Sequence, residues 1–86
     1  MDGPWKLHPQ VALRPEPFGA LAYHYGTRRL TFLRSPELVE LVRHLGDHGS
    51  LEDALRASTI DERRWPSYRT ALRALVQSEL LVPSAA

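Results

Sequence analysis

The side chains in this sequence with the widest range of chemistry are four histidines. His44 and His48 are four residues apart, so on an unbroken helix they would share one face, as zinc ligands often do. Gly46 lies between them at an expected helix end, and the sequence offers no third ligand at motif spacing. We therefore expect both to be solvated side chains near a helix C-terminus. His8 and His24 are expected to be ordinary polar residues, and we predict no metal site.

Other catalytic groups are equally sparse. The sequence has no cysteine, which excludes a thiolate nucleophile, a cysteine-ligated metal and a disulfide framework. Ser35 and Ser50 stand where helix caps are expected, and there is no Gly-x-Ser-x-Gly motif. The five glycines are scattered and form no phosphate-binding loop. The core of an 86-residue domain leaves little room for a pocket, so we expect a protein that is not an enzyme and binds no cofactor.

Length and composition predict one small domain. The 86 residues are 43% hydrophobic and 24% charged, with a net charge of +1, which is ordinary globular usage without a strongly basic surface. We expect a single domain over 1–86, with loose ends at 1–6 and 84–86. Neither a signal peptide nor an apolar run of about 18 residues is present. The sequence therefore predicts a soluble, cytoplasmic protein without membrane contact.

The residue pattern in the first third of the chain predicts β-strands. Residues 10–14 alternate polar and apolar before Pro15, which is expected to end that strand. Residues 19–25 and 28–33 predict a hairpin whose two-residue turn, Gly26-Thr27, is of type II′. This turn places Leu21 opposite Phe32 and brings the apolar faces together, so the face bearing Leu21 is expected to be buried. The third strand is then a sheet edge.

The residue pattern in the rest of the chain predicts helices. Ser35 is the expected cap of a first helix that Gly46 ends, and Ser50 caps a short second one. The third helix starts either at Asp61 or near Pro66 and continues to about residue 78. Three short strands followed by three helices predict a compact α+β unit with the outline of a small winged helix-turn-helix domain.

Charge is unevenly distributed along this outline. Between residues 35 and 57, five acids stand against two arginines, whereas arginines bracket the third strand and line the third helix. In the third helix, five residues share an apolar stripe at about 100° per residue, namely Trp65, Tyr68, Leu72, Leu75 and Val76. Arg69 and Arg73 lie beside it. An apolar margin flanked by arginines is typical of a groove that binds an extended, acidic peptide.

Two stretches carry a resemblance to a known family. The segment Ala22-Tyr-His-Tyr-Gly-Thr-Arg-Arg-Leu-Thr-Phe-Leu-Arg-Ser-Pro-Glu-Leu38 and the closing segment from Trp65 to Val82 resemble the PqqD-like precursor-peptide recognition elements of ribosomal peptide-modification pathways. The opening Trp-Lys-Leu-His-Pro at 5–9 and the Tyr-His-Tyr-Gly hairpin are most similar to the mycofactocin branch. The similarity spans about residues 5–83 and contains no catalytic signature.

The resemblance implies a non-enzymatic chaperone. Such proteins bind the leader of a precursor peptide as an added strand on the third strand, against the third helix, and deliver it to a radical S-adenosylmethionine (SAM) enzyme. In the mycofactocin pathway that enzyme acts on a C-terminal Val-Tyr. The implied peptide-binding residues are Arg29, Leu30, Thr31, Phe32, Leu33, Trp65, Tyr68, Arg69, Arg73 and Val76. Among these, Arg69 and Arg73 are expected to pair with leader acids.

Two other classes remain as alternatives. Three helices and a hairpin could form a DNA-binding winged helix, although a net charge of +1 and Trp65-Pro66 at the start of the third helix argue against it. A small enzyme would have to use the histidines. The acidic first-two-helix side is, by elimination, the candidate surface for the radical SAM enzyme. An edge strand also permits dimers, so the sequence leaves the oligomeric state open.

Overall fold

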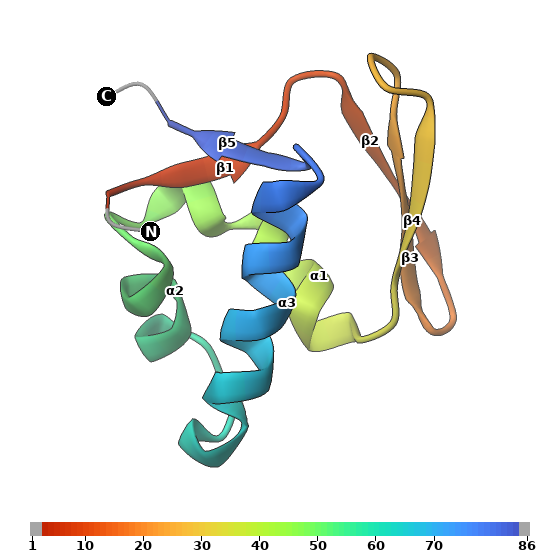
Figure 1. Ribbon diagram of the computed structural model, residues 1–86. Helices are drawn as coiled ribbons and strands as arrows, with labels where there is room; N and C mark the ends of the chain where they lie inside the picture. The colour runs from red at the N-terminus through yellow and green to blue at the C-terminus, as the bar shows by residue number, and fades with distance from the viewer. Residues whose placement is uncertain (1–2, 85–86) are drawn as a thin grey trace.

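The computed structural model describes residues 3–84 and has the predicted α+β class (Figure 1). A three-stranded antiparallel sheet is followed by three helices, and a second, two-stranded sheet joins the two ends of the described chain. The elements in chain order are β1 (Trp5–Leu7), β2 (Val11–Glu16), β3 (Gly19–His24), β4 (Arg29–Leu33), α1 (Pro36–Arg43), α2 (Leu51–Ala57), α3 (Trp65–Gln77) and β5 (Leu81–Pro83).

The larger sheet has the order β2-β3-β4, so β4 is an edge strand as predicted. Its register is also the predicted one, with Leu21 opposite Phe32 and Tyr23 opposite Leu30. Pro15 does not end β2 but lies inside it, opposite Ala20. Because β2 is the other edge of the sheet, the missing N–H of proline costs no ladder hydrogen bond there if it faces solvent.

The turn of the β3–β4 hairpin differs from the prediction. The loop between the strands contains four residues, not two, and its positive φ belongs to Arg28 (60°) rather than to Gly26. His24 organises it, because its Nδ1 accepts hydrogen bonds from the backbone N–H groups of Gly26 (3.0 Å) and Thr27 (3.2 Å). The register is unchanged, because the longer loop only ends the ladder one pair earlier, at His24 and Arg29.

The prediction of which hairpin face is buried is wrong. In β3 the buried side chains are Ala20, Ala22 and His24, and the larger apolar side chains point to the other, outer face. Helix α1 packs on the inner face of β3, where alanines leave room for the leucines and valines of the helix. Period-two alternation defines two faces, and the close approach of α1 decides which one is inside.

Strands β1 and β5 correct the expectation of loose ends at residues 3–6. Trp5 pairs with Pro83 and Leu7 with Leu81, and the N–H of Ser84 donates to the carbonyl of Pro4 at 2.9 Å. Leu81 is buried in the main core. The remaining positions of the predicted ends, 1–2 and 85–86, lie outside the described residues.

The first two helices begin at the predicted caps. The hydroxyl of Ser35 accepts from the N–H of Leu38 (3.2 Å), and that of Ser50 accepts from the N–H of Asp53 (3.0 Å). Helix α1 ends at Arg43, before Gly46, which instead lies in a 3₁₀ turn over Leu45–Asp47. Of the two predicted starts of the third helix, the structure uses the one near Pro66. Asp61 caps a 3₁₀ turn over residues 62–64, and α3 follows from Trp65 with Pro66 in its first turn.

Within residues 3–84, no helix is long and apolar enough to span a membrane, and no cluster of three or more histidines and acids could hold a metal ion. The imidazole of His44 contacts the carboxylates of Glu40 (3.2 Å) and Asp47 (3.5 Å) on the exposed end of α1. It is therefore a surface residue near a helix C-terminus, as expected from the sequence.

Candidate functional site

The unpaired edge of β4 is the first feature of the candidate site. Its residues alternate between the two faces of the sheet, as the cross-strand partners in β3 show. Arg29 and Thr31 lie opposite residues of the buried face, whereas Leu30 and Phe32 lie on the outer face and are each 52% exposed. Leu33 is only 2% exposed and belongs to the core, so its side chain cannot contact a ligand without repacking.

Helix α3 is attached to the end of β4 through a buried tyrosine. The hydroxyl of Tyr68 lies 3.1 Å from Oγ of Ser35, the residue directly before α1, and accepts a hydrogen bond from Arg64 at 2.9 Å. The guanidinium of Arg64 also lies 5.3 Å from the centre of the Tyr68 ring and 3.9 Å from the carboxylate of Glu37. These contacts fix the position of α3 relative to the edge strand.

The glutamate of this network is held in its charged form. The backbone N–H of Glu37 lowers the pKa of its carboxyl group, and the hydroxyl of Ser35, which donates at 3.0 Å, and the charge of Arg64 lower it further. The carboxylate also lies in the first turn of α1, where negative charge is favourable. The network therefore stays charged and intact at neutral pH.

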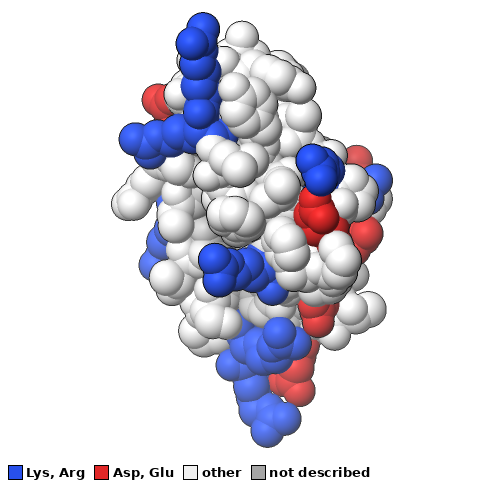
Figure 2. All heavy atoms as spheres, turned by 90° about the vertical axis from the view of Figure 1, so that its right-hand side faces the viewer, with Lys and Arg blue, Asp and Glu red and all other residues white. Residues whose placement is uncertain are grey.

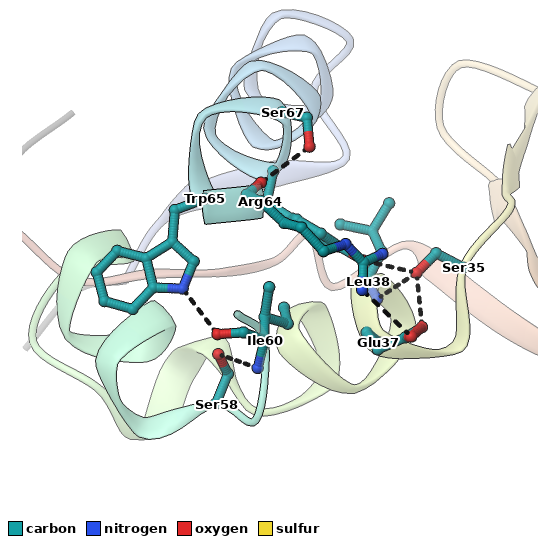
Figure 3. Close-up of polar contacts among 9 residues, drawn as sticks. Ser35, Glu37, Leu38, Ser58, Ile60, Arg64, Trp65 and Ser67 are labelled. Carbon is teal, nitrogen blue, oxygen red and sulfur yellow. Dashed lines mark hydrogen bonds and ion pairs between the residues drawn. The ribbon is translucent and has the colours of Figure 1, made fainter. Parts of the chain in front are cut away.

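The predicted residues of α3 lie on two different flanks of the helix. Figure 3 shows Trp65 and Arg64 leaving the start of α3 in opposite directions, Trp65 toward Ile60 and Arg64 toward Ser35 and Glu37. The indole Nε1 of Trp65 donates to the carbonyl of Ile60 at 3.0 Å. Trp65 is therefore half-buried against the segment that follows α2, and not against β4.

Arg69 lies on the same flank as Trp65. Its guanidinium donates two hydrogen bonds of 2.7 Å to the carboxylate of Glu52 in α2. These bonds lower the pKa of Glu52 and raise that of Arg69. Arg73 follows Arg69 by four residues, so it lies on the same flank of the helix. The structure thus joins Tyr68 to the end of β4 only through Ser35 and leaves Trp65, Arg69 and Arg73 on the other flank, while Val76 is half-buried against the core.

The flank of α3 on the β4 side contains residues that sequence reasoning did not select. Arg64 and Ala71 are seven residues apart, so they share the face from which Tyr68 reaches Ser35. Ala71 is half-buried against the core. The sequence signal was available in the helical spacing, but only the Tyr68–Ser35 contact shows which side of the stripe faces the edge strand.

Three arginines without an acidic partner bracket β4. Within residues 3–84, Arg28, Arg29 and Arg34 have no carboxylate within 4.0 Å, whereas Arg63, Arg64 and Arg69 of the α3 region each have one. Figure 2 views the side of the molecule that carries the three-stranded sheet and shows an uncharged area between basic groups above and below it, with acidic groups along one edge. Arg73 of α3 also has no carboxylate within 4.0 Å in the described residues, so unpaired positive charge lies both beside the edge strand and on α3.

Two hollows of the described structure lie elsewhere. One, of about 580 Å³, opens between α1 and α2, with Leu41, Ala54 and Ile60 among its lining residues and Glu40 and Asp47 at its acidic side. A second, of about 320 Å³, lies between the sheet and α1 and is lined by residues of β2, β3 and α1. Neither hollow includes a residue of β4, so a ligand at the edge strand would bind a surface and not a pocket.

Residues 4–82 match the sequence profile of the peptide chaperone MftB family. The chain belongs to this family. Proteins named peptide chaperone MftB are 51% identical in Mycolicibacterium smegmatis, over 95% of this chain and 80% of that protein, and 48% identical in Mycobacterium ulcerans, over 99% and 78%. The MftB chaperone of Mycobacterium tuberculosis is 46% identical over 95% of this chain and 75% of that protein.

The fold of this MftB family member also occurs inside a larger chain. Structures of Escherichia coli MccB match it with a TM-score of 0.60 in the complex with MccA-N7isoASN and 0.58 in the complex with AMPCPP and MccA. The identities are 19% and 20%, which establish a shared fold only. The match covers 98% and 96% of this chain but 24% and 23% of the MccB chains.

Proposed function

We propose that this chain is a precursor-peptide chaperone of mycofactocin biosynthesis that performs no chemistry itself. It binds the leader of a ribosomally made precursor peptide and delivers it to a radical SAM enzyme. Membership of the peptide chaperone MftB family supports this role. The resemblance of residues 22–38 to peptide recognition elements points the same way.

The observation that carries the proposed mode of binding is the free edge of β4 beside α3. An extended leader satisfies the unpaired backbone groups of the edge by adding a fourth strand, and side-chain contacts then set its register. Delivery works by raising the effective concentration of the peptide at the enzyme. The proposed contacts are the backbone of Arg29–Leu33, the side chain of Arg29, and Ala71 on the near flank of α3.

The free arginines indicate the chemistry of the leader. Three arginines close to the edge, Arg28, Arg29 and Arg34, lack acidic partners within residues 3–84. An acidic leader would supply carboxylates to pair with them. Arg69 is omitted from the proposed contacts because its guanidinium already holds Glu52 at 2.7 Å. The same ion pairing argues against a DNA-binding α3, since most arginines of that region are already paired within the chain.

A titration of the ¹⁵N-labelled protein with the precursor peptide, followed by amide NMR, tests the proposal. We expect the largest shifts at residues 29–33 and on the near flank of α3 around Ala71, with small shifts in α2. A folded protein that shows no shift in β4 with the peptide in excess would contradict strand addition. Titration with duplex DNA would then test the winged-helix alternative.

Two proline variants test the backbone contact directly. Successive residues of an edge strand direct their N–H groups alternately into the sheet and away from it, so one of Leu30 and Thr31 contributes an N–H to the free edge. Pro15 shows that an edge of this sheet accepts proline. We expect one of Leu30→Pro and Thr31→Pro to disrupt the hairpin and the other to fold and lose leader binding. A folded proline variant with wild-type affinity would exclude the strand-addition mode.

A further inference from the structure

The outer face of the three-stranded sheet is an apolar surface that the fold leaves uncovered. Within residues 3–84, the exposed large hydrophobic side chains are Phe18 (39%), Tyr25 (62%), Leu30 (52%) and Phe32 (52%), and all four belong to this sheet or its turns. The other faces of the described molecule carry none. A small protein that exposes its large apolar side chains in one place uses that place for contact with a partner.

These side chains form one connected patch. The rings of Phe18 and Phe32 lie 5.9 Å apart, and Phe32 stands opposite Leu21 in the β3–β4 ladder. Tyr23 stands opposite Leu30 and packs edge-on against Tyr25, with ring centres 4.8 Å apart. We call these six residues the outer patch. Figure 2 faces this side of the molecule and shows an uncharged area on it, with basic groups above and below.

The margin of the outer patch is positively charged. The guanidinium of Arg34 lies 5.4 Å from the centre of the Phe32 ring, and Arg28 lies in the turn at the other end of β4. Neither has an acidic partner within residues 3–84. On the β2 side the margin is closed by Arg14, whose Nε lies 2.9 Å from a carboxylate oxygen of Glu16. The unpaired positive charge is therefore on the β4 side, and a partner that covers the patch must be apolar at its centre and acidic where its rim meets Arg28 and Arg34.

We propose that the outer patch is the docking surface for the radical SAM enzyme, which presents an apolar site with an acidic rim. This inference rests on the proposed function, because it assigns the second partner of the same chaperone. Strand β4 would then serve both partners, with its edge for the leader and its outer face for the enzyme. The leader would leave the chaperone directly beside the surface on which the enzyme sits.

A second copy of the chain fits this face less well. Two copies packed face to face would bring the unpartnered arginines, Arg28 and Arg34, into one interface without acids to pair them. The acidic hollow between α1 and α2 is the other surface to consider, since its lining residues include Glu37, Glu40 and Asp47. Its apolar side chains are largely buried, however, whereas those of the outer patch project into solvent.

The test compares binding of the two partners by variants of the patch that avoid the proposed leader contacts. The double variant Phe18→Ser/Tyr25→Ser removes two exposed rings, and Leu21→Thr changes the centre of the patch with a residue suited to strands. The control Glu40→Gln/Asp47→Asn alters the α1–α2 hollow. Each folded variant is titrated separately with the leader peptide and with the purified radical SAM enzyme, and light scattering gives the mass of the free protein.

We expect both patch variants to bind the leader within about twofold of the wild type and the enzyme at least about tenfold more weakly, with the control unchanged. Unchanged enzyme affinity in the patch variants would overturn the docking site and leave the proposed function intact. Loss of enzyme binding in the control alone would assign docking to α1 and α2 instead. A wild-type dimer that the patch variants convert to monomer would make a second copy the occupant. A wild type that binds the enzyme through the patch but no leader would refute the proposed function and keep the docking site.

Discussion

The hydroxyl of Tyr68 lies 3.1 Å from Oγ of Ser35, and this contact joins α3 to the short connection between the edge strand β4 and α1. The same Ser35 hydroxyl caps α1 through the N–H of Leu38. One side chain thus fixes the relative positions of the strand edge, α1 and α3. The proposed leader site, at the free edge of β4, is thus connected to both helices through Ser35.

Removing the Tyr68 hydroxyl should loosen this junction without disturbing the core. Tyr68→Phe keeps the buried ring but loses the hydrogen bonds to Ser35 and Arg64, so we expect the free energy of unfolding to fall by about 1–2 kcal/mol. Leader affinity should fall as well, because α3 is less firmly held beside β4. Urea denaturation and a leader titration measure the two effects. Ser67→Ala, on the exposed side of the same turn, is the control and should change neither.

The roles of the arginines can be separated by two single substitutions. Arg29→Ala removes an unpartnered charge beside the free edge, so leader affinity should fall several-fold and its dependence on salt should weaken. Arg69→Ala removes an arginine that already pairs with Glu52, so leader affinity should stay near the wild-type value while stability decreases. Isothermal titrations at low and high salt compare them. The opposite result would indicate that Arg69 pairs with acidic residues of the leader, as predicted from the sequence alone.

The hairpin shows how far the sequence could be interpreted. Its register and edge position follow from period-two alternation, and the structure confirms both. The buried face could not be chosen from the same pattern, because the larger side chains of Leu21 and Tyr23 favoured the face that proves to be outside. What decides it is the packing of α1 on Ala20 and Ala22, a long-range contact that no local pattern records.

The candidate site was predictable in part for the same reason. Helical spacing correctly groups Tyr68, Leu72 and Leu75 as the buried stripe of α3. It cannot show which border of that stripe faces β4 and which faces α2. The ion pair of Arg69 with Glu52, 17 residues apart in the sequence, settles this only in the folded chain. The β1–β5 pair, which joins distant ends of the described chain, was missed because each strand is only three residues long.

Acid should destabilise the protein through its paired carboxylates. The hydrogen bonds from Arg69 hold the pKa of Glu52 below its ordinary value of 4.5, and the pKa of Glu37 and Asp61 is lowered as well. A carboxyl group whose pKa is lower in the folded state than in the unfolded state stabilises the fold. This contribution is complete above the unfolded-state pKa and is lost as the pH falls through the folded-state pKa. The free energy of unfolding should therefore be level near neutral pH and decline below 4.5.

The variant Arg69→Gln tests the contribution of Glu52 to this decline. It removes the main cause of the lowered Glu52 pKa, so the loss of stability between neutral pH and about pH 3 should be smaller than in the wild type. Arg43→Gln is the matched control, because Arg43 lies 4.0 Å from Glu40 on the exposed side of α1. Urea denaturation across the pH range gives the three curves. If the free energy of unfolding falls equally with decreasing pH in Arg69→Gln and in the wild type, Glu52 does not contribute to the loss of stability in acid.

Gly19 should be the least replaceable glycine of the chain. Its φ is +146°, and a Cβ added there would collide with the carbonyl oxygen of Leu33, where β3 begins beside the end of β4. We expect Gly19→Ala to lower the free energy of unfolding by more than about 2 kcal/mol, because neither backbone can move without breaking the ladder. Leader binding should weaken in parallel, since the displaced strand is the proposed docking edge. Gly46→Ala is the control, because an added Cβ there meets only ordinary contacts, the nearest being Cβ of Lys6 at 3.7 Å. Thermal denaturation and leader titration of both variants make the comparison, and equal stability of the two would refute the close approach of Gly19 to Leu33.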